Sequence, residues 1–462
     1  MMRPVSFTFS AFSVDPASST VRFTYRVGFK HGIAITLRDR LVFEHVPQES
    51  WGKIPKTVLE PTLQALLLMI GINYWAIFPT KNIRIDGFSL TRAQAQFWDS
   101  LYLNGLAEFF YDMQMDFDDL IAFPYDDTHT LSEPTRLSVR HRALLLNGAG
   151  KDSILSAEIL KAEGMPFDFF VFSPTPAHER IAKLVGAETV QVRRQRDWKA
   201  GLVAAFFNIS GSYPSVSTFT FVATLLAQLL GYDSIIFSNE RSADSGNLMY
   251  RGLPVNHQWC KSSEAERMIN DYIRAYITPD IRTYSLLREF SELEIVRRFV
   301  RYPQYLSQVT SCNSYFWLPP WLQRIKRRAY WCKRCPKCVF LFASYSAFLP
   351  KNQVIDMFET DLYTREKLIP LFRRILGIEG FKPLDCVGEP EEMILAMHYA
   401  SRAREYQNET AMRMFEQHFA SYDFDSAERR VFEFKDSPHA KEVGKTSSPT
   451  PPITKASYVS VD

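Results

Sequence analysis

Cysteine is scarce in this chain, and positive charge barely outweighs negative charge. The 462 residues include six cysteines, and 54 lysines and arginines oppose 51 aspartates and glutamates, for a formal net charge of +3. Secreted disulfide scaffolds are dense in cysteine, and nucleic-acid-binding domains are usually strongly basic. We therefore expect no nucleic-acid partner and no disulfide framework, and we expect a reducing, cytoplasmic compartment.

Long apolar runs are also missing. The longest, from Leu63 to Phe78, is interrupted by Gln64 and Asn73. It is shorter than the roughly 18 to 20 residues that a membrane span needs, so it predicts a buried helix instead. The N-terminus lacks the basic start, apolar core and small-residue cleavage site of a secretory signal. The sequence therefore predicts no membrane partner.

Patterning along the chain predicts four segments. Apolar and polar residues alternate over residues 5–50, which predicts an antiparallel sheet, and the pattern of residues 55–110 is helical. Ser, Thr, Pro and Lys dominate the last residues, which cannot bury enough apolar surface to fold. The predicted segments are an N-terminal α+β domain (1–135), a nucleotide-binding α/β domain (136–275), a helical region with a cysteine cluster (276–434) and a disordered tail (435–462).

Strands and helices alternate in the second segment. This alternation predicts an α/β fold, in which a parallel sheet has helices on both faces and ligands bind at the carboxyl ends of the strands. Gly164, Gly186 and Gly231 follow helices, where a left-handed C-cap is favoured. The predicted strands are 143–147, 167–173, 188–194 and 233–238, and the predicted helices are 153–164, 178–186 and 216–230.

The small-residue stretch Gly148–Ser153, "GAGKDS", joins the first of these strands to its helix. It is not a Walker loop, because Leu145 stands where that loop needs Gly and Asp152 follows Lys151. Small residues let a backbone approach a phosphate, and the amides at a helix N-terminus bind anions. A phosphate loop is one interpretation. An ordinary strand-to-helix turn, N-capped by Asp152 or Ser153, is the other.

The same stretch resembles the Ser-Gly-Gly-x-Asp-Ser loop of the PP-loop ATP pyrophosphatases, which have the adenine-nucleotide α-hydrolase (HUP-like) fold. Gly150, Asp152 and Ser153 match that loop, whereas Gly148 replaces its Ser and Ala149 its first Gly. If the loop needs a positive φ at Ala149, the methyl group costs about 1 kcal/mol of strain. The resemblance implies that ATP binds here and is split into AMP and pyrophosphate.

A second concentration of polar residues, 238–266, follows the strand 233–238. Hydrogen-bonding side chains outside regular structure usually bind a polar ligand or a metal, although a solvated surface loop is the alternative. The candidates are Asn239, Glu240, Arg241, Asp244, Asn247, Asn256, His257, Gln258 and Lys261.

Several motifs in this order carry a family resemblance. They are "FWDSLYLNGLAEFFYDM" (97–113), "SNERSA" (238–243), "VNHQ" (255–258), "SLLREFSELEIVRRF" (285–299), "TSCN" (310–313) and "RCPKC" (334–338). This series resembles the UDP-N-acetylmuramoyl-L-alanyl-L-glutamate epimerases over roughly residues 5 to 350. The resemblance implies ATP-dependent epimerisation of the terminal L-glutamate of a small-molecule peptidoglycan precursor through an acyl-adenylate.

The resemblance also implies roles for the candidate residues, with ATP and Mg²⁺ as cofactors. Gly148, Gly150, Lys151, Asp152, Ser153 and Ser173 are expected to bind the nucleotide and its metal. Lys151, Glu240, Asp244, His257 and Cys260 are the catalytic candidates, with His257 and Cys260 proposed for proton transfer. Asn239, Arg241, Asn247, Asn256, Gln258 and Lys261 are expected to bind the substrate.

Three cysteines in "WCKRCPKC" are spaced to reach one tetrahedral ion. Cys332, Cys335 and Cys338 supply three thiolates, and Cys312 is the obvious fourth ligand. A similar four-cysteine zinc site occurs in the 7-cyano-7-deazaguanine synthases, another PP-loop group. We therefore predict structural zinc, with reactive free thiols or an iron–sulfur cluster as alternatives.

Two alternatives to the epimerase remain at the level of sequence. One is another PP-loop adenylating enzyme, such as an amide ligase or a tRNA-modifying enzyme, although the near-neutral charge weighs against tRNA. The other is a non-catalytic binding descendant, which only the Ala149 departure supports. The oligomeric state is not predicted.

Overall fold

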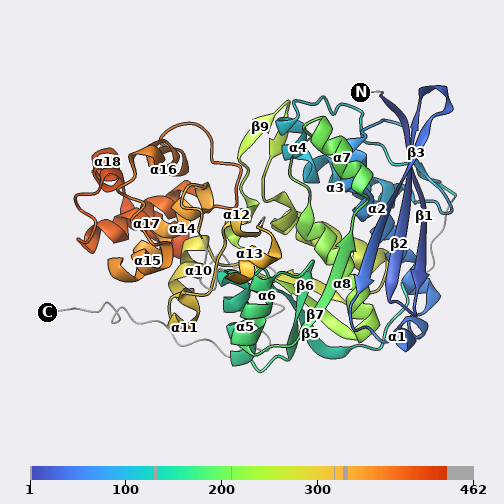
Figure 1. Ribbon diagram of the computed structural model, residues 1–462, viewed down its shortest axis with the longest axis horizontal. Helices are drawn as coiled ribbons and strands as arrows, with labels where there is room; N and C mark the ends of the chain where they lie inside the picture. The colour runs from blue at the N-terminus through green and yellow to red at the C-terminus, as the bar shows by residue number, and fades with distance from the viewer. Residues whose placement is uncertain (1–2, 129–132, 210, 317, 326–330, 434–462) are drawn as a thin grey trace.

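A nine-stranded mixed sheet runs through the protein (Figure 1). The computed structural model describes residues 3–128, 133–209, 211–316, 318–325 and 331–433. The strand order is β11-β8-β5-β6-β7-β3-β2-β1-β4, and a two-stranded sheet β10-β9 lies outside it. The strands are β1 (Pro4–Asp15), β2 (Thr20–Phe29), β3 (Ala34–Phe43), β4 (Ile83–Ile85), β5 (Arg140–Leu146), β6 (Phe167–Phe172), β7 (Thr189–Gln195), β8 (Tyr232–Phe237), β9 (Leu248–Tyr250), β10 (Leu253–Val255) and β11 (Arg282–Ser285).

The N-terminal strands form the predicted antiparallel sheet, but this sheet is not separate from the parallel one. β1, β2 and β3 pair antiparallel, and Arg40–Phe43 of β3 then pairs antiparallel with Val192–Gln195 of β7. The sheet therefore crosses the predicted domain boundary at residue 135. β4 pairs with β1 and lies inside the stretch 55–110, so the helical prediction is wrong at those three residues.

The parallel half contains every strand predicted from the α/β alternation. β8, β5, β6 and β7 pair in parallel, and the glycines Gly186 and Gly231 adopt the expected left-handed conformation, with φ of 73° and 76°. β11 extends this half beyond β8, within the region predicted to be helical. That prediction is wrong at β11 because four residues show too few alternations to outweigh the helical pattern around them.

Helices cover both faces of the parallel half, and alternate β5 residues enter separate cores. Leu144 packs into the core with α2 and α8, whereas Ala143 and Leu145 pack into the core with α5 and α6. The predicted buried helix is α2, whose last twelve residues are all buried or nearly so. The helices of the first face are α1 (Gln48–Lys53), α2 (Lys56–Ile77), α3 (Arg92–Gly105), α4 (Ala107–Asp112), α7 (Trp198–Phe206), α8 (Ser215–Leu230) and α9 (Ser263–Tyr276).

The second face carries α5, α6 and the C-terminal helices. α10 packs against α5, α14 and α17, and so joins the C-terminal helices to the sheet. Figure 1 shows helices α14 to α18 at the opposite end of the molecule from β1, β2 and β3. The helices are α5 (Lys151–Ala162), α6 (Pro176–Val185), α10 (Glu292–Phe299), α11 (Pro303–Leu306), α12 (Asn313–Phe316), α13 (Pro320–Ile325), α14 (Pro336–Ser346), α15 (Lys351–Phe358), α16 (Ile369–Ile375), α17 (Pro390–Arg402), α18 (Thr410–Phe419) and α19 (Phe424–Phe432).

Within the described ranges, none of these helices combines the length and the apolar character that crossing a bilayer requires. The predicted disordered tail, residues 435–462, lies outside the described residues.

Candidate active site

The small-residue loop lies where predicted, between the carboxyl end of β5 and the first turn of α5. Ala149 has a φ of 56°, so the position does require the left-handed conformation, and its amide donates to Asn147 Oδ1 at 2.8 Å. Gly148 is exposed, and a Cβ added to it would meet nothing within 4 Å. Gly150 occupies the N-cap position of α5 without a side-chain cap, so the expectation that Asp152 or Ser153 is the N-cap is wrong, whereas the choice between a phosphate loop and an ordinary turn stays a prediction.

Lys151 begins α5 and is buried between two carboxylates. Its ammonium donates to Asp152 and, at 2.5 Å, to Glu292 Oε2 at the start of α10. Burial acts to lower the pKa of Lys151, but the two carboxylates outweigh it and raise the pKa above its usual value. Burial also raises the pKa of Glu292. Glu292 was not among the predicted site residues, although it falls inside the family motif 285–299.

Two buried side chains near this pair have polar atoms without partners among the described residues. Glu240, just beyond β8, has a free Oε1, and Gln258 has a free Nε2. Both side chains are more than nine-tenths buried. Buried polar groups are usually satisfied, so such orphans commonly face a ligand. Arg288 stiffens the surrounding loops by donating to the carbonyl oxygens of Glu240 and Lys261, at 3.0 and 2.6 Å.

Lys261 contacts a cysteine that was not among the predicted site residues. Its ammonium donates to Gln258 Oε1 at 3.1 Å and to Cys386 Sγ at 3.3 Å. Burial acts to lower the pKa of Lys261, but negative charge on Cys386, Glu240 and Glu292 raises it. A row of charged groups, each acting electrostatically on the next, therefore leads from the first turn of α5 to Cys386; its members are Lys151, Glu292, Glu240, Lys261 and Cys386.

His257 lies at the far end of this row, between a carboxylate and the thiol. Its Nδ1 is 2.7 Å from Glu108 Oε2 on α4, and the ring also hydrogen-bonds with Cys386. Burial opposes a charge on the ring, but Cys386 and Glu108 raise the pKa of His257 to about 10. Burial likewise opposes a thiolate, but Lys261, Lys337 and His257 lower the pKa of Cys386 to about 6. The two groups therefore favour an imidazolium–thiolate pair at neutral pH.

Three predicted site residues, all asparagines, hydrogen-bond to neighbouring loops and strands. Asn247 donates to the Pro383 carbonyl and accepts the His257 amide at 2.9 Å, so it joins the loops that carry His257 and Cys386. Asn239 donates to Ser285 Oγ at 2.9 Å, between β8 and β11. Asn256 donates to the Ala243 carbonyl, also at 2.9 Å. These amides tie together the segments that carry the site, and their predicted substrate roles stay predictions.

Two predicted charged residues make hydrogen bonds to other parts of the protein. The Arg241 guanidinium donates to carbonyl oxygens at the C-terminus of α19, including Val431 at 2.8 Å. The Asp244 carboxylate accepts the amide and hydroxyl of Ser263 at the start of α9, at 2.6 and 3.0 Å. Their predicted catalytic or substrate roles stay predictions, and we leave both residues out of the site proposed below.

The last two candidates flank the site. Ser173 is exposed and has a φ of 56°. It directly follows β6, which pairs with β5, the strand before the small-residue loop Gly148–Ser153. Cys260 lines a small pocket together with His257 and Glu108, and burial raises the pKa of its thiol. A cysteine held in this way is protonated at neutral pH, which leaves Cys386 as the one of the two that is ionised and can act as a nucleophile or base there.

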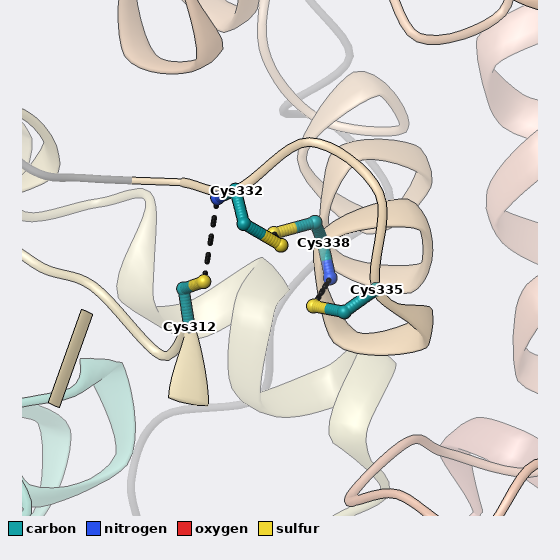
Figure 2. Close-up of side chains that lie close together, drawn as sticks. All are labelled: Cys312, Cys332, Cys335 and Cys338. Atoms are coloured by element: carbon teal, nitrogen blue, oxygen red, sulfur yellow. Dashed lines mark hydrogen bonds between the residues drawn. The ribbon is translucent and has the colours of Figure 1, made fainter. Parts of the chain in front are cut away.

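The predicted cysteine cluster is assembled by three segments of chain (Figure 2). Cys312 precedes α12, Cys332 lies in a loop, and Cys335 and Cys338 begin α14. All four sulfur atoms lie within 4.8 Å of one another, and those of Cys332 and Cys338 are 3.7 Å apart. Zn–S bonds of about 2.3 Å in a tetrahedron place sulfurs about 3.8 Å apart, so these residues fit a structural zinc ion.

The segment that carries Cys312 also contacts the loop after β5. Cys312 belongs to the segment Thr310–Asn313, and a Cβ added to Gly150 would meet Ser311 Oγ at 3.1 Å and the Thr310 carbonyl at 3.8 Å. At the other end of this segment, Asn313 donates to Asp385, the neighbour of Cys386. The cluster therefore anchors a segment that contacts both ends of the site.

A helix N-terminus and a row of buried charges at the carboxyl ends of parallel strands define an α/β protein with an enzyme-like polar site. The MurL N-terminal domain family matches residues 2–286, and the MurL C-terminal domain family matches residues 308–429. The chain belongs to the MurL family.

Two relatives carry the name UDP-N-acetyl-alpha-D-muramoyl-L-alanyl-L-glutamate epimerase. The protein from Xanthomonas oryzae pv. oryzae is 30% identical over 375 residues, covering 79% of this chain and 80% of the relative. The protein from Micromonospora sp. is 30% identical over 417 residues, covering 89% and 90%.

Proposed function

We propose that this protein epimerises the terminal L-glutamate of UDP-MurNAc-L-Ala-L-Glu to D-glutamate, with ATP consumed to AMP and pyrophosphate. The names of the relatives support the substrate and the outcome. The observation that carries the ATP-dependent route is the loop after β5, where α5 begins with free amides beside the exposed Gly148. We place this half of the protein in the PP-loop group on that basis.

ATP answers a chemical difficulty in the reaction. The α-proton of a glutamate whose carboxyl is ionised is barely acidic, because its removal puts a second negative charge beside the first. Transfer of AMP to the carboxylate removes that charge and gives an acyl-adenylate, whose α-proton a side chain can take. Reprotonation on the other face inverts the centre, and hydrolysis of the adenylate makes the result irreversible.

The loop end of the site suits the first step. The amides of Gly150, Asp152 and Ser153 would hold the β- and γ-phosphates, because a helix N-terminus favours anions. Lys151 would balance charge that develops during AMP transfer, and Glu292 keeps its ammonium in place. The Asp152 carboxylate, in the first turn of α5 and about a third exposed, would hold the Mg²⁺ that accompanies ATP.

Zinc has a structural role in this proposal. Cys312, Cys332, Cys335 and Cys338 would hold the ion with no open position, as structural zinc sites do. The ion would fix the segment Thr310–Asn313 against Gly150. The proposed chemistry does not pass through it.

Two ATP analogues test the proposed route. The purified protein is incubated with UDP-MurNAc-L-Ala-L-Glu and either β,γ-imido-ATP or α,β-methylene-ATP. The glutamate is then freed from the product by acid hydrolysis, and its chirality is measured. We expect D-glutamate with the β,γ-analogue, whose α–β bond can still break, and none with the α,β-analogue. D-Glutamate formed with the α,β-analogue, or ADP formed from ATP, would refute adenylation.

A further inference from the structure

Four side chains from three separate segments surround the thiol end of the site. Glu108 lies on α4, His257 and Lys261 lie in the loop between β10 and α9, and Cys386 lies in the loop between α16 and α17. The order of contacts is carboxylate, imidazole, thiol and ammonium, with Glu108 Oε2 2.7 Å from His257 Nδ1 and Lys261 Nζ 3.3 Å from Cys386 Sγ. A nucleophile or base, oriented by an imidazole that a carboxylate orients in turn, is a recurring catalytic arrangement.

We infer that Cys386, oriented by His257 and Glu108 and charge-balanced by Lys261, is the thiolate that removes the α-proton of the terminal glutamate. This inference rests on the function proposed above. Its geometric support is the position of the Cys386 sulfur, which the Lys261 ammonium contacts at 3.3 Å beside His257, while Glu240 and Glu292 act electrostatically on the same ammonium. Because the α-carbon is bonded directly to the carboxyl group that is adenylated, the inference requires the triphosphate of ATP to extend from the loop after β5 toward Cys386, so that AMP transfer takes place beside the thiol.

The proton and electron balance is simple. The α-C–H bond of the acyl-adenylate breaks, an S–H bond forms on Cys386, and the electron pair moves into the carbonyl to give an enolate. The Lys261 ammonium next to the sulfur can stabilise that negative charge. A proton from solvent then adds to the α-carbon on the opposite face and gives the D-configured glutamyl-adenylate. The Cys386 thiol finally loses its proton to solvent, which restores the thiolate and leaves no net change in protons.

The groups around Cys386 and His257 set the pH range in which the thiolate and the imidazolium are both charged. Cys386 faces Lys261, Lys337 and His257 and lies near Cys260, while His257 also faces Glu108 and Asp112. The pKa of Cys386 falls to about 6 and that of His257 rises to about 10, so the pair is charged between these values. The neighbouring Asp385 accepts the Cys386 amide and Asn313. The ligand atoms of His257, Asp385 and Cys386 lie within 4.8 Å of one another, so the chelator arm of the alkylation experiment below tests for a bound metal.

The decisive experiment separates adenylation from proton exchange. Cys386→Ala and Cys386→Ser are assayed for pyrophosphate–ATP exchange that depends on UDP-MurNAc-L-Ala-L-Glu, and for deuterium uptake at the glutamate α-carbon in deuterated water. We expect pyrophosphate exchange to persist and deuterium uptake to fall by about 10²- to 10⁴-fold. Deuterium uptake at the wild-type rate in either variant would overturn the inference. If the wild-type protein lacks pyrophosphate exchange, the proposed function fails instead, and the two failures are thus distinguishable.

Alkylation of the wild-type protein gives a test that does not depend on a variant folding. Iodoacetamide is added across a range of pH, and the modification of Cys386 is followed by mass spectrometry of its peptide. We expect the rate to rise with a midpoint near pH 6, and UDP-MurNAc-L-Ala-L-Glu with ATP to protect the thiol. A midpoint near that of an ordinary cysteine, about 8.5, would overturn the inference. So would a thiol that reacts only after a chelator removes a metal.

Discussion

The two ends of the charged row are built in different ways. The loop end comes from one contiguous stretch, in which β5, Gly148–Gly150 and α5 follow one another, and only Glu292 is added from elsewhere. The thiol end is assembled from Glu108, His257, Lys261 and Cys386. More than a hundred residues of sequence separate Glu108 from His257, and more than a hundred separate Lys261 from Cys386. A contiguous site leaves a sequence motif, whereas an assembled one leaves single residues that become meaningful only in the fold.

Variants at the two ends are therefore expected to lose different steps of the reaction. If the loop end activates the carboxylate and the thiol end moves the proton, damage at the loop must stop both AMP formation and proton exchange. Damage at the thiol end must stop proton exchange alone.

The largest effect is expected for Lys151→Met. Methionine fills the space of the buried side chain but leaves Asp152 and Glu292 without their cation. Removing one partner of a buried pair costs about 3–5 kcal/mol, so we expect a lower free energy of unfolding by that amount. We also expect loss of both AMP formation and deuterium uptake, measured in the same sample.

A double variant separates the two consequences of that change. Lys151→Met with Glu292→Gln removes both charges of the closer pair, and we expect it to recover much of the lost stability in urea unfolding but none of the AMP formation. Recovery of activity together with stability would mean that Lys151 has only a structural role.

Loss of the zinc cluster is expected to affect the loop end through Thr310–Asn313. For Cys338→Ser we expect zinc affinity to fall by more than about 100-fold, since even a residue supporting a ligand is worth 10- to 100-fold. Elemental analysis of the purified protein measures the zinc, and the KM for ATP should rise because Ser311 no longer packs firmly against Gly150. Wild-type protein free of zinc with full activity would contradict this role.

A smaller and more specific effect is expected for Glu108→Gln. Glutamine can still hydrogen-bond His257 but carries no charge, so the raised pKa of His257 falls from about 10 and the thiolate loses part of its cation. The acid limb of the deuterium-uptake profile, expected near pH 6, should therefore move to higher pH. A shift of one unit corresponds to about 1.4 kcal/mol, or about tenfold in rate on that limb.

The matched control for this change is Glu264→Gln. Glu264 is exposed and accepts the Trp259 indole at 3.0 Å in the same loop region. We expect its pH profile to match that of the wild type. Equal shifts in both variants would show that the loop, and not the charge at Glu108, controls the profile.

The smallest effect is expected for Ala149→Gly, which restores the glycine of the PP-loop motif. Because Ala149 has a φ of 56°, the change relieves strain and should stabilise the protein by about 0.5–1 kcal/mol. The same change at Ala157, inside α5, should instead destabilise it. Thermal unfolding of the two variants compares the signs, and a loss of stability in Ala149→Gly would contradict a strained loop.

The sequence was most informative where structure is local. The α/β alternation correctly predicted strands β5 to β8 and helices α5, α6 and α8. The spacing of Cys332, Cys335 and Cys338 correctly predicted a cluster, because their sulfur atoms lie within 4.8 Å of one another. β4 and β11 were missed because three or four residues carry too little periodicity. The pairing of β3 with β7 was missed because nothing local in either strand specifies its neighbour.

The single residues of the site were also predictable only where they lie in a locally recognisable segment. His257 and Lys261 were selected because they lie in a polar segment, but Cys386 stands alone in its stretch, and Glu108 lies in an aromatic helix. Arg241 and Asp244 were selected on the same grounds as His257, yet they bind α19 and the start of α9. Composition identifies a polar segment but does not say which of its side chains turn inward.

The dependence of proton exchange on ATP tests the account most directly. The wild-type protein is incubated with UDP-MurNAc-L-Ala-L-Glu in deuterated water, with and without ATP, and deuterium at the glutamate α-carbon is measured by mass spectrometry. The account predicts uptake only when ATP is present and AMP is formed, because the thiolate can take the proton only from the adenylated glutamate. Uptake at the same rate without any nucleotide would contradict it.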